Sequence, residues 1–170
     1  DKEAAIKTRS IIMFAGPLIH HLKNFSLPHA QGCKLGKRTI SAHSYALEEL
    51  GVKVKVTNQS YEFSSKKLKP ANIIMYESGD TACENILTAA ALLQGKTTIK
   101  FASSNYMVQE VCFFLEKLGV KIDGIGTTTV TVHGVEKIDI DIEYYNSEDP
   151  IESMMWITAA IATNSKLEIK

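Results

Sequence analysis

The sequence predicts an α/β fold built from repeated helix-and-strand units, with buried helices inside and sheets outside. Two segments recur about 70 residues later: LEELGVKV at 47–54 returns as LEKLGVKI at 115–122, and a second pair lies at 88–100 and 158–170. A period of this length is too long for helical solenoid repeats and suits a small α/β unit used several times. The segment 86–93 is apolar almost all round. Because a helix without a polar face must be buried on every side, the helices are expected to form the interior.

The first unit is predicted to span residues 1–70. Apolar residues predict a helix from Ser10 to about Lys23, after which the chain is expected to run extended to Pro28. A second helix is predicted from Ser41 to Leu50, because Gly51 is a typical helix stop. The alternating VKVKV that follows predicts a half-buried strand, with YEFSSKKL as its hairpin partner.

The second unit, 71–148, is predicted to repeat this order. We expect a helix from Thr81 to Leu93, a strand at TTIKFA, a helix from Ser104 to Leu118 and a closing strand at TTTVTVHGV. Thr81 and Glu84 match a capping box, in which each side chain satisfies a free backbone N–H at the start of a helix.

A third unit is predicted to begin within 149–170. Asp149-Pro-Ile-Glu152 matches a second capping box, with Pro150 at the favoured first helical position. The helix 152–162 is apolar on nearly all sides, so we expect it to be buried, with Trp156 packed inside. The final residues, SKLEIK, alternate in the manner of a strand.

Composition excludes several classes of protein. The 170 residues are 45% hydrophobic and carry a formal net charge of zero, so no overall basic field attracts nucleic acid or a membrane surface. No apolar run reaches the roughly 20 residues that a membrane span needs. Three cysteines at unrelated spacings predict neither a disulfide framework nor a metal site, and they indicate a reducing, cytoplasmic environment. The start is no signal peptide, and both ends are typical of a piece of a longer protein.

The segment QGCKLGKRT is the best candidate for reactive chemistry. Gly32 and Gly36 give the backbone freedom around Cys33, and the cations just downstream favour the thiolate form of its side chain. On composition alone, Cys33 is either a reactive group or an ordinary loop residue. Of the 19 cations only Arg9 and Arg38 are arginines, whose planar donors suit phosphate or carboxylate. The helix start in YESGDTACEN is a third position that suits an anion, so we expect a substrate with several phosphates or carboxylates.

Several motifs together resemble the enolpyruvyl transferase family. These are RSIIMFAGPL, SLP followed by GC and G.R, ENILTAAALL with GKTTIK, and FLEKLGVKI.G.GT. The resemblance extends over essentially the whole chain, and its most specific element is Gly-Cys-x-x-Gly-x-Arg at 32–38. It implies a fold of two similar domains, each made of three helix-and-strand units with the helices inside, an inside-out α/β barrel. The chain would then hold two units of one domain, with 149–170 near the crossing to the other domain.

The resemblance is strongest to the members that act on UDP-N-acetylglucosamine. It implies transfer of enolpyruvate from phosphoenolpyruvate to the 3-hydroxyl of the nucleotide sugar, with release of phosphate. That reaction is the first committed step of peptidoglycan and hence cell-wall synthesis. The resemblance implies small-molecule substrates only, no cofactor and no metal. It also implies that the remainder of the chain completes the site, so that this piece alone is inactive.

The resemblance also assigns roles to single residues. Cys33 matches the loop cysteine that donates a proton, forms an adduct with phosphoenolpyruvate and is alkylated by fosfomycin. Arg38 matches the arginine that holds the phosphate of phosphoenolpyruvate, and Arg9 matches an arginine at the substrate site. His43 matches a family histidine, although a histidine at a helix start is also often a surface residue. Segments matching the uridine and diphosphate contacts supply further substrate-binding candidates: Thr39, Ile40, Ser41, Ala42, Glu77, Ser78, Gly79 and Asp80.

The sequence also departs from the family pattern, which leaves the acceptor open. Thr39-Ile40-Ser41-Ala42 stands where the family usually has Pro-Val-Asp-Leu, whose aspartate helps to read uracil. Glu77 stands at the position of a basic residue, and Asp80 adds a second negative charge beside the expected diphosphate. One alternative is therefore an enolpyruvyl transferase with another acceptor, or one acting on 3-phosphoshikimate; Cys33 argues against the latter, which lacks the loop cysteine. Another alternative is a non-catalytic binding domain on the same scaffold.

Overall fold

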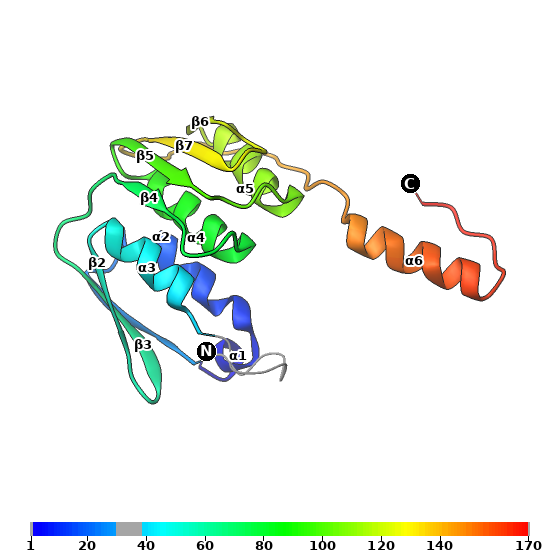
Figure 1. Ribbon diagram of the computed structural model, residues 1–170, viewed down its shortest axis with the longest axis horizontal. Coiled ribbons are helices and arrows are strands. Elements are labelled where there is room, and N and C mark those ends of the chain that lie inside the picture. Colours follow the sequence, from blue (N-terminus) through cyan, green and yellow to red (C-terminus); the bar gives the residue numbers. More distant parts are fainter. Residues whose placement is uncertain (1, 30–38, 170) are drawn as a thin grey trace.

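The computed structural model describes residues 2–29 and 39–169, which form two β-sheets packed against a set of helices (Figure 1). Two of the predicted site residues, Cys33 and Arg38, lie outside the described residues. The helical elements are α1 (Lys2–Lys7), the 3₁₀ helix η1 (Arg9–Phe14), α2 (Ala15–Leu18), α3 (Ser41–Glu49), α4 (Asp80–Ala91), α5 (Tyr106–Lys117) and α6 (Pro150–Ala162).

The strands form one three-stranded and one four-stranded sheet. They are β1 (Asn24–Pro28), β2 (Val52–Val56), β3 (Ser60–Ser65), β4 (Asn72–Ile74), β5 (Gly95–Lys100), β6 (Lys121–Asp123) and β7 (Thr129–Gly134). The first sheet has the order β1-β3-β2 and is antiparallel throughout. The second has the order β4-β5-β7-β6, in which only the β4 and β5 pair is parallel. The short edge strand β4 was not predicted from the sequence.

The two sheets repeat one pattern of connections. In the chain, β1 is followed by α3, β2 and β3, and β5 is followed by α5, β6 and β7. In both sheets the last of these strands lies between the other two and pairs with each of them antiparallel. The recurring LEELGVKV and LEKLGVKI segments form the end of the helix, α3 or α5, and the start of the following strand. Gly51 and Gly119 follow these helices with φ angles of 94° and 89°, a backbone conformation that favours glycine. The predicted helix stop at Gly51 is therefore confirmed.

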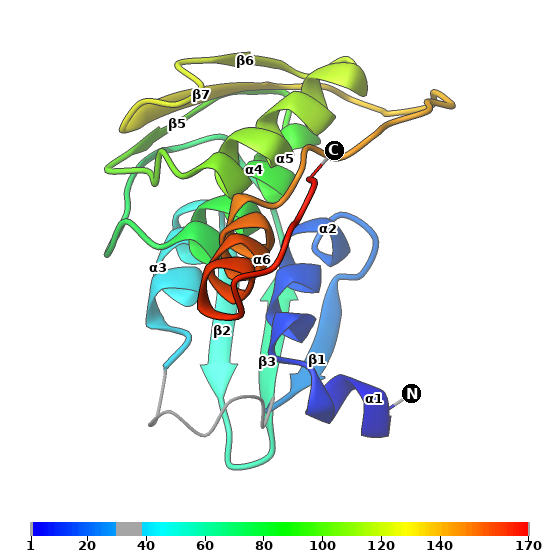
Figure 2. The ribbon, with the colours of Figure 1, turned by 90° about the vertical axis from the view of Figure 1, so that its right-hand side faces the viewer.

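Helix α4 lies at the centre of the hydrophobic core. It packs against α2, α3 and α5, and the strand β7 covers it from the four-stranded sheet. Most of its side chains are buried, including Ile86, Leu87 and Ala90. Figure 1 places the four-stranded sheet above α4 and α5, and Figure 2 shows the same layers from the side. The predicted α/β class, with a helical interior and external sheets, is confirmed around α4.

The first predicted helix, Ser10 to Lys23, is wrong in type and in length. The chain forms η1 and then α2, which ends at Leu18. Pro17 has no backbone N–H, so the α-helical hydrogen bond to the Met13 carbonyl oxygen cannot form, and the segment before α2 is 3₁₀ rather than α-helical. The same residue is tolerated in the first turn of α2, where such N–H groups have no helical partner.

Helix α6 forms as predicted but is not buried. The Asp149 side chain caps it by accepting hydrogen bonds from the backbone N–H groups of Ile151 at 2.9 Å and Glu152 at 3.4 Å. None of its residues is buried, and Trp156 keeps 51% of its surface exposed. In the described chain no element covers α6, which projects from the body of the structure (Figure 1). Residues 165–169 form no strand, because no described strand lies beside them to complete hydrogen-bonded pairs.

No helix among residues 2–29 and 39–169 is long and apolar enough to cross a membrane.

Replacing Gly16 with alanine is expected to lower the free energy of unfolding by about 1–3 kcal/mol. A Cβ at Gly16 would lie 2.5 Å from Thr88 Oγ1 and 2.7 Å from Asn85 Oδ1, and it would also meet the backbone oxygen of Asn85. Denaturant unfolding measures the loss. The matched control is Gly79→Ala, where the new methyl meets only the movable Glu77 carboxylate, at 3.1 Å. Equal stability of the two variants would contradict the close approach of α2 to α4.

Candidate functional site

The described candidate residues gather where η1, α3 and α4 begin. Arg9 is the first residue of η1, the segment Thr39–His43 leads into α3, and Glu77–Asp80 leads into α4. Helix α4 packs against both η1 and α3. Thr81 in the first turn of α4 lies 3.5 Å from His43 near the start of α3, and the charge of Arg9 acts on His43, so these segments meet at one end of the helical core. Cys33 and Arg38 belong to the same candidate site by prediction, and their positions lie outside the described residues.

His43 is a buried, uncharged member of this group. Its side chain lies in the core, and the whole residue is only 8% exposed. Nδ1 lies 3.1 Å from Asn85 Nδ2, and Nε2 lies 3.5 Å from Thr81 Oγ1. Burial, and to a smaller extent the positive charge of Arg9, lower the pKa of His43 to about 4. The imidazole is therefore neutral at pH 7, and the alternative of a surface histidine is wrong.

Asn85 connects three neighbouring helical segments to α4. The sequence analysis did not identify this role. Asn85 is completely buried on α4. Its Oδ1 accepts a hydrogen bond from the Gly16 backbone N–H at 2.6 Å, and its Nδ2 donates to the Ile12 carbonyl oxygen at 3.1 Å. With the His43 contact, one amide connects η1, α2 and α3 to α4. The available signal was an amide directly before the largely apolar segment 86–93, in a helix that is expected to be buried.

The segment 39–42 has two exposed polar side chains. Thr39 and Ser41 are exposed, whereas Ile40 and Ala42 are buried and belong to the hydrophobic core. The backbone N–H of Ser41 donates to Thr39 Oγ1 at 3.5 Å. Ile40 occupies the N-cap position of α3 without a capping side chain. Ser41 and Thr39 are thus the polar groups that this segment presents to solvent.

Asp80 is occupied by structural contacts. Its Oδ1 accepts a hydrogen bond from Ser103 Oγ at 2.5 Å, and its Oδ2 accepts one from Asn105 Nδ2 at 2.9 Å. The carboxylate therefore ties the start of α4 to the loop before α5. Glu77 and Ser78 remain exposed.

The predicted capping by Thr81 is wrong, because α4 begins one residue earlier, at Asp80. Gly79 occupies the N-cap position, and no side chain caps the helix from there. Thr81 lies in the first turn instead, with its hydroxyl directed at His43.

The two described cysteines are buried and unreactive. Burial, the first of several causes, raises the pKa of the Cys83 thiol, and Cys83 Sγ accepts a hydrogen bond from the Ser103 backbone N–H at 3.2 Å. Burial also raises the pKa of Cys112 to about 12. Because the thiolate is the nucleophilic form, neither group is a candidate for the reactive role that is predicted for Cys33.

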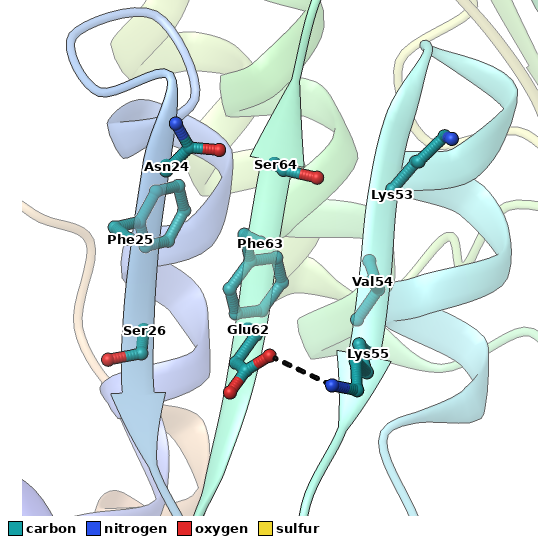
Figure 3. Close-up of a pocket in the computed structure, with 9 residues that line it drawn as sticks. All are labelled: Asn24, Phe25, Ser26, Lys53, Val54, Lys55, Glu62, Phe63 and Ser64. Carbon is teal, nitrogen blue, oxygen red and sulfur yellow. Dashed lines mark ion pairs between the residues drawn. The ribbon is translucent and has the colours of Figure 1, made fainter.

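A groove of about 630 Å³ lies elsewhere, on the β1-β3-β2 sheet (Figure 3). Neighbouring strands supply its polar residues, and Figure 3 shows Glu62 reaching across to Lys55, at 3.6 Å. Both partners of this ion pair are largely exposed, so the pair adds little to stability. None of the predicted site residues lines the groove. Within residues 2–29 and 39–169 no group of three or more histidine, cysteine and acidic side chains is arranged to hold a metal ion.

The chain is similar in sequence to a set of bacterial carboxyvinyltransferases. The sequence profile described as EPSP synthase (3-phosphoshikimate 1-carboxyvinyltransferase) matches residues 3–170. UDP-N-acetylglucosamine 1-carboxyvinyltransferase of Treponema denticola is 38% identical over 168 residues, which cover 99% of this chain and 39% of the relative. The namesake from Bradyrhizobium diazoefficiens is 38% identical over 169 residues, with the same two coverages. The chain thus spans about two fifths of the length of the relatives it matches.

Solved structures with the same fold are also enolpyruvyl transferases. The enolpyruvyl transferase NikO from Streptomyces tendae superimposes with a TM-score of 0.79 at 20% identity, covering 94% of this chain and 38% of that one. EPSP synthase from Acinetobacter baumannii gives a TM-score of 0.59 at 16% identity, covering 78% of this chain and 30% of that one. These likenesses concern the fold, and the sequence profile covers nearly every residue. The chain therefore belongs to the EPSP synthase family, the enolpyruvyl transferases that its motifs resemble.

Proposed function

We propose that the complete protein transfers enolpyruvate from phosphoenolpyruvate to the 3-hydroxyl of UDP-N-acetylglucosamine. It would thereby carry out the first committed step of peptidoglycan synthesis, in the cytoplasm. Relatives at 38% identity bear the name of this activity. The observation that carries the proposal is the convergence of Arg9, the start of α3 and the start of α4 at one end of the core. These three segments each match a substrate-binding segment of the family, and together they would contact one substrate.

In this reaction Arg38 and Cys33 would act on phosphoenolpyruvate, the substrate that donates the enolpyruvyl group. The acceptor hydroxyl gives up its proton to a base of the complete site as its oxygen adds to the central carbon of phosphoenolpyruvate, and Cys33 delivers a proton to the methylene carbon. The bond between the central carbon and the phosphate oxygen then breaks, and a proton of the new methyl group returns to the Cys33 thiolate, which restores the double bond in the product. Arg38 holds the departing phosphate, because a guanidinium matches its oxygens in a bidentate manner. Delivery of a proton by a positioned side chain contributes about 10²–10⁴-fold to the rate of such a step.

A diphosphate would bind beside the start of α4. Asp80 is held against the loop before α5, because both of its oxygens accept hydrogen bonds from protein side chains. The N-terminus of α4, which has no capping side chain, offers backbone N–H groups to an anion together with exposed Ser78. Glu77 is the exposed acidic residue of this segment, and it is the observation that favours a different nucleotide-sugar acceptor as the second candidate.

The remainder of the chain would complete this site. We infer two repeat units, about 1–70 and 71–148, with a third beginning at 149, since the two sheets share their strand order and their connecting helices. The exposed apolar side chains of α6 are then covered by later parts of the same protein. Both substrates would be held between two walls, of which the described residues form one.

The complete protein is expected to release phosphate from phosphoenolpyruvate with UDP-N-acetylglucosamine and not with 3-phosphoshikimate. Cys33→Ser should lower the rate at least about hundredfold, because the proton donor is lost. After treatment with fosfomycin, peptide mass spectrometry should place the adduct on Cys33 and leave Cys83 and Cys112 unmodified, because both are buried. Phosphate release with another nucleotide sugar alone would identify the second candidate. No phosphate release and no binding of any nucleotide sugar would support a non-catalytic domain.

In the complete protein, Ile161→Ala is expected to lower the free energy of unfolding by about 2–5 kcal/mol, as for other large-to-small core changes. Ile161 is 77% exposed here, so the effect would report contacts with the remainder of the chain. Denaturant unfolding provides the measurement, with exposed Lys166→Ala as a control expected to change stability by no more than about 0.5 kcal/mol. An Ile161→Ala variant as stable as this control would argue that α6 stays uncovered.

A further inference from the structure

The orientation of the Asn85 amide follows from its neighbours. The Gly16 backbone N–H can only donate a hydrogen bond, so the atom 2.6 Å from it is the amide oxygen, Oδ1. The amide nitrogen Nδ2 therefore lies on the other side, where it has two hydrogens to donate. The Ile12 carbonyl oxygen and His43 Nδ1 each lie 3.1 Å from Nδ2 and take one hydrogen each. A flipped amide would set its oxygen against the Ile12 carbonyl oxygen and its nitrogen against the Gly16 N–H.

This orientation decides where His43 carries its proton. Nδ1 accepts a hydrogen bond from Asn85, so it holds a lone pair and no hydrogen. A neutral imidazole has one N–H, which must then be on Nε2. Burial and the charge of Arg9 lower the pKa of His43 to about 4, which agrees with a neutral ring. Protonation of Nδ1 would set an N–H against the N–H of Asn85 inside the core, where an unmatched donor is costly.

The proton on Nε2 faces the candidate site. Nε2 points to Thr81 Oγ1 at 3.5 Å, and Thr81 is an exposed residue in the first turn of α4. Arg9 already supplies a positive charge close to His43. A second cation beside it would be repelled, whereas a neutral N–H adds a hydrogen-bond donor without adding charge.

We propose that Asn85 is a positioning residue that holds His43 as its neutral Nε2–H tautomer, so that the ring presents an uncharged donor where η1, α3 and α4 meet. The acceptor would be Thr81 Oγ1 or a substrate oxygen of the phosphate or sugar-hydroxyl class. Only this identification of the acceptor rests on the proposed function. The tautomer itself follows from the contacts of Gly16, Ile12 and His43 with one amide.

The tautomer is measured directly by NMR on the complete protein labelled with ¹⁵N-histidine. At pH 7, long-range ¹H–¹⁵N correlations should show His43 Nδ1 with the shift of an unprotonated nitrogen and Nε2 with that of a protonated one. The resonances are assigned by their loss in His43→Gln. His20 is the internal control, because its Nε2 lies 2.7 Å from the Ala89 carbonyl oxygen and takes the same tautomer without help from Asn85. A protonated Nδ1 in His43 would overturn the proposal.

Asn85→Asp tests the role of the amide. A carboxylate at this place accepts rather than donates, so the proton of His43 is expected to appear on Nδ1 while the shifts of His20 stay unchanged. His43 resonances that remain as in the parent protein would show that Asn85 does not set the tautomer. If the variant does not fold, the measurement on the parent protein still decides the protonation of Nδ1. Both readouts are independent of turnover, so a wrong assignment of the reaction would not change them.

Discussion

The burial of α4 is the constraint on which the rest of the structure depends. A helix with apolar side chains on every face is stable in water only if other elements enclose it, and here α2, α3, α5 and β7 do so. Small residues make this close approach possible. Ala89 and Ala90 are fully buried on α4, and Gly16 of α2 lies against Asn85 and Thr88 of the same helix with no room for a Cβ. The positions of the surrounding segments are thus set by contact with one helix.

The residues of the candidate site are held in place by hydrogen bonds to that core. Asn85 is the one fully buried amide of α4, and a buried amide left unpaired would cost about 1–3 kcal/mol for each missing partner. Its contacts with Gly16, Ile12 and His43 therefore constrain the distances among η1, α2 and α3. Asp80 ties the start of the same helix to Ser103 and the loop before α5. A site whose residues are fixed by such contacts needs little rearrangement to receive its ligand.

The sequence predicts the parts of this structure that depend on local pattern. The recurring segments, the strand alternation and the glycine stops at Gly51 and Gly119 identify the repeated helix-and-strand order, because each signal acts within a few residues. The 3₁₀ turn before α2 and the helix end at Leu18 were missed, because apolar content alone indicated one continuous helix. The role of Asn85 was also missed, since its partners are 42 to 73 residues away in the chain. Contacts of that kind appear only when the fold is known.

A comparison of α4 with α6 shows that the burial of an apolar helix depends on the elements around it as well as on its sequence. They share the pattern TAAALL and TAAIAT, yet α4 is enclosed and α6 has no buried residue. The start of α6 is nevertheless anchored to α5: the Tyr106 hydroxyl donates to Asp149 at 3.0 Å, and Glu110 accepts hydrogen bonds from Tyr144 at 2.8 Å and Ser147 Oγ at 2.7 Å. The direction in which α6 leaves the described body is therefore held by side-chain contacts. Since a similar pattern is enclosed in α4, the exposed faces of α6 are the place where the third unit that we propose would add its contacts.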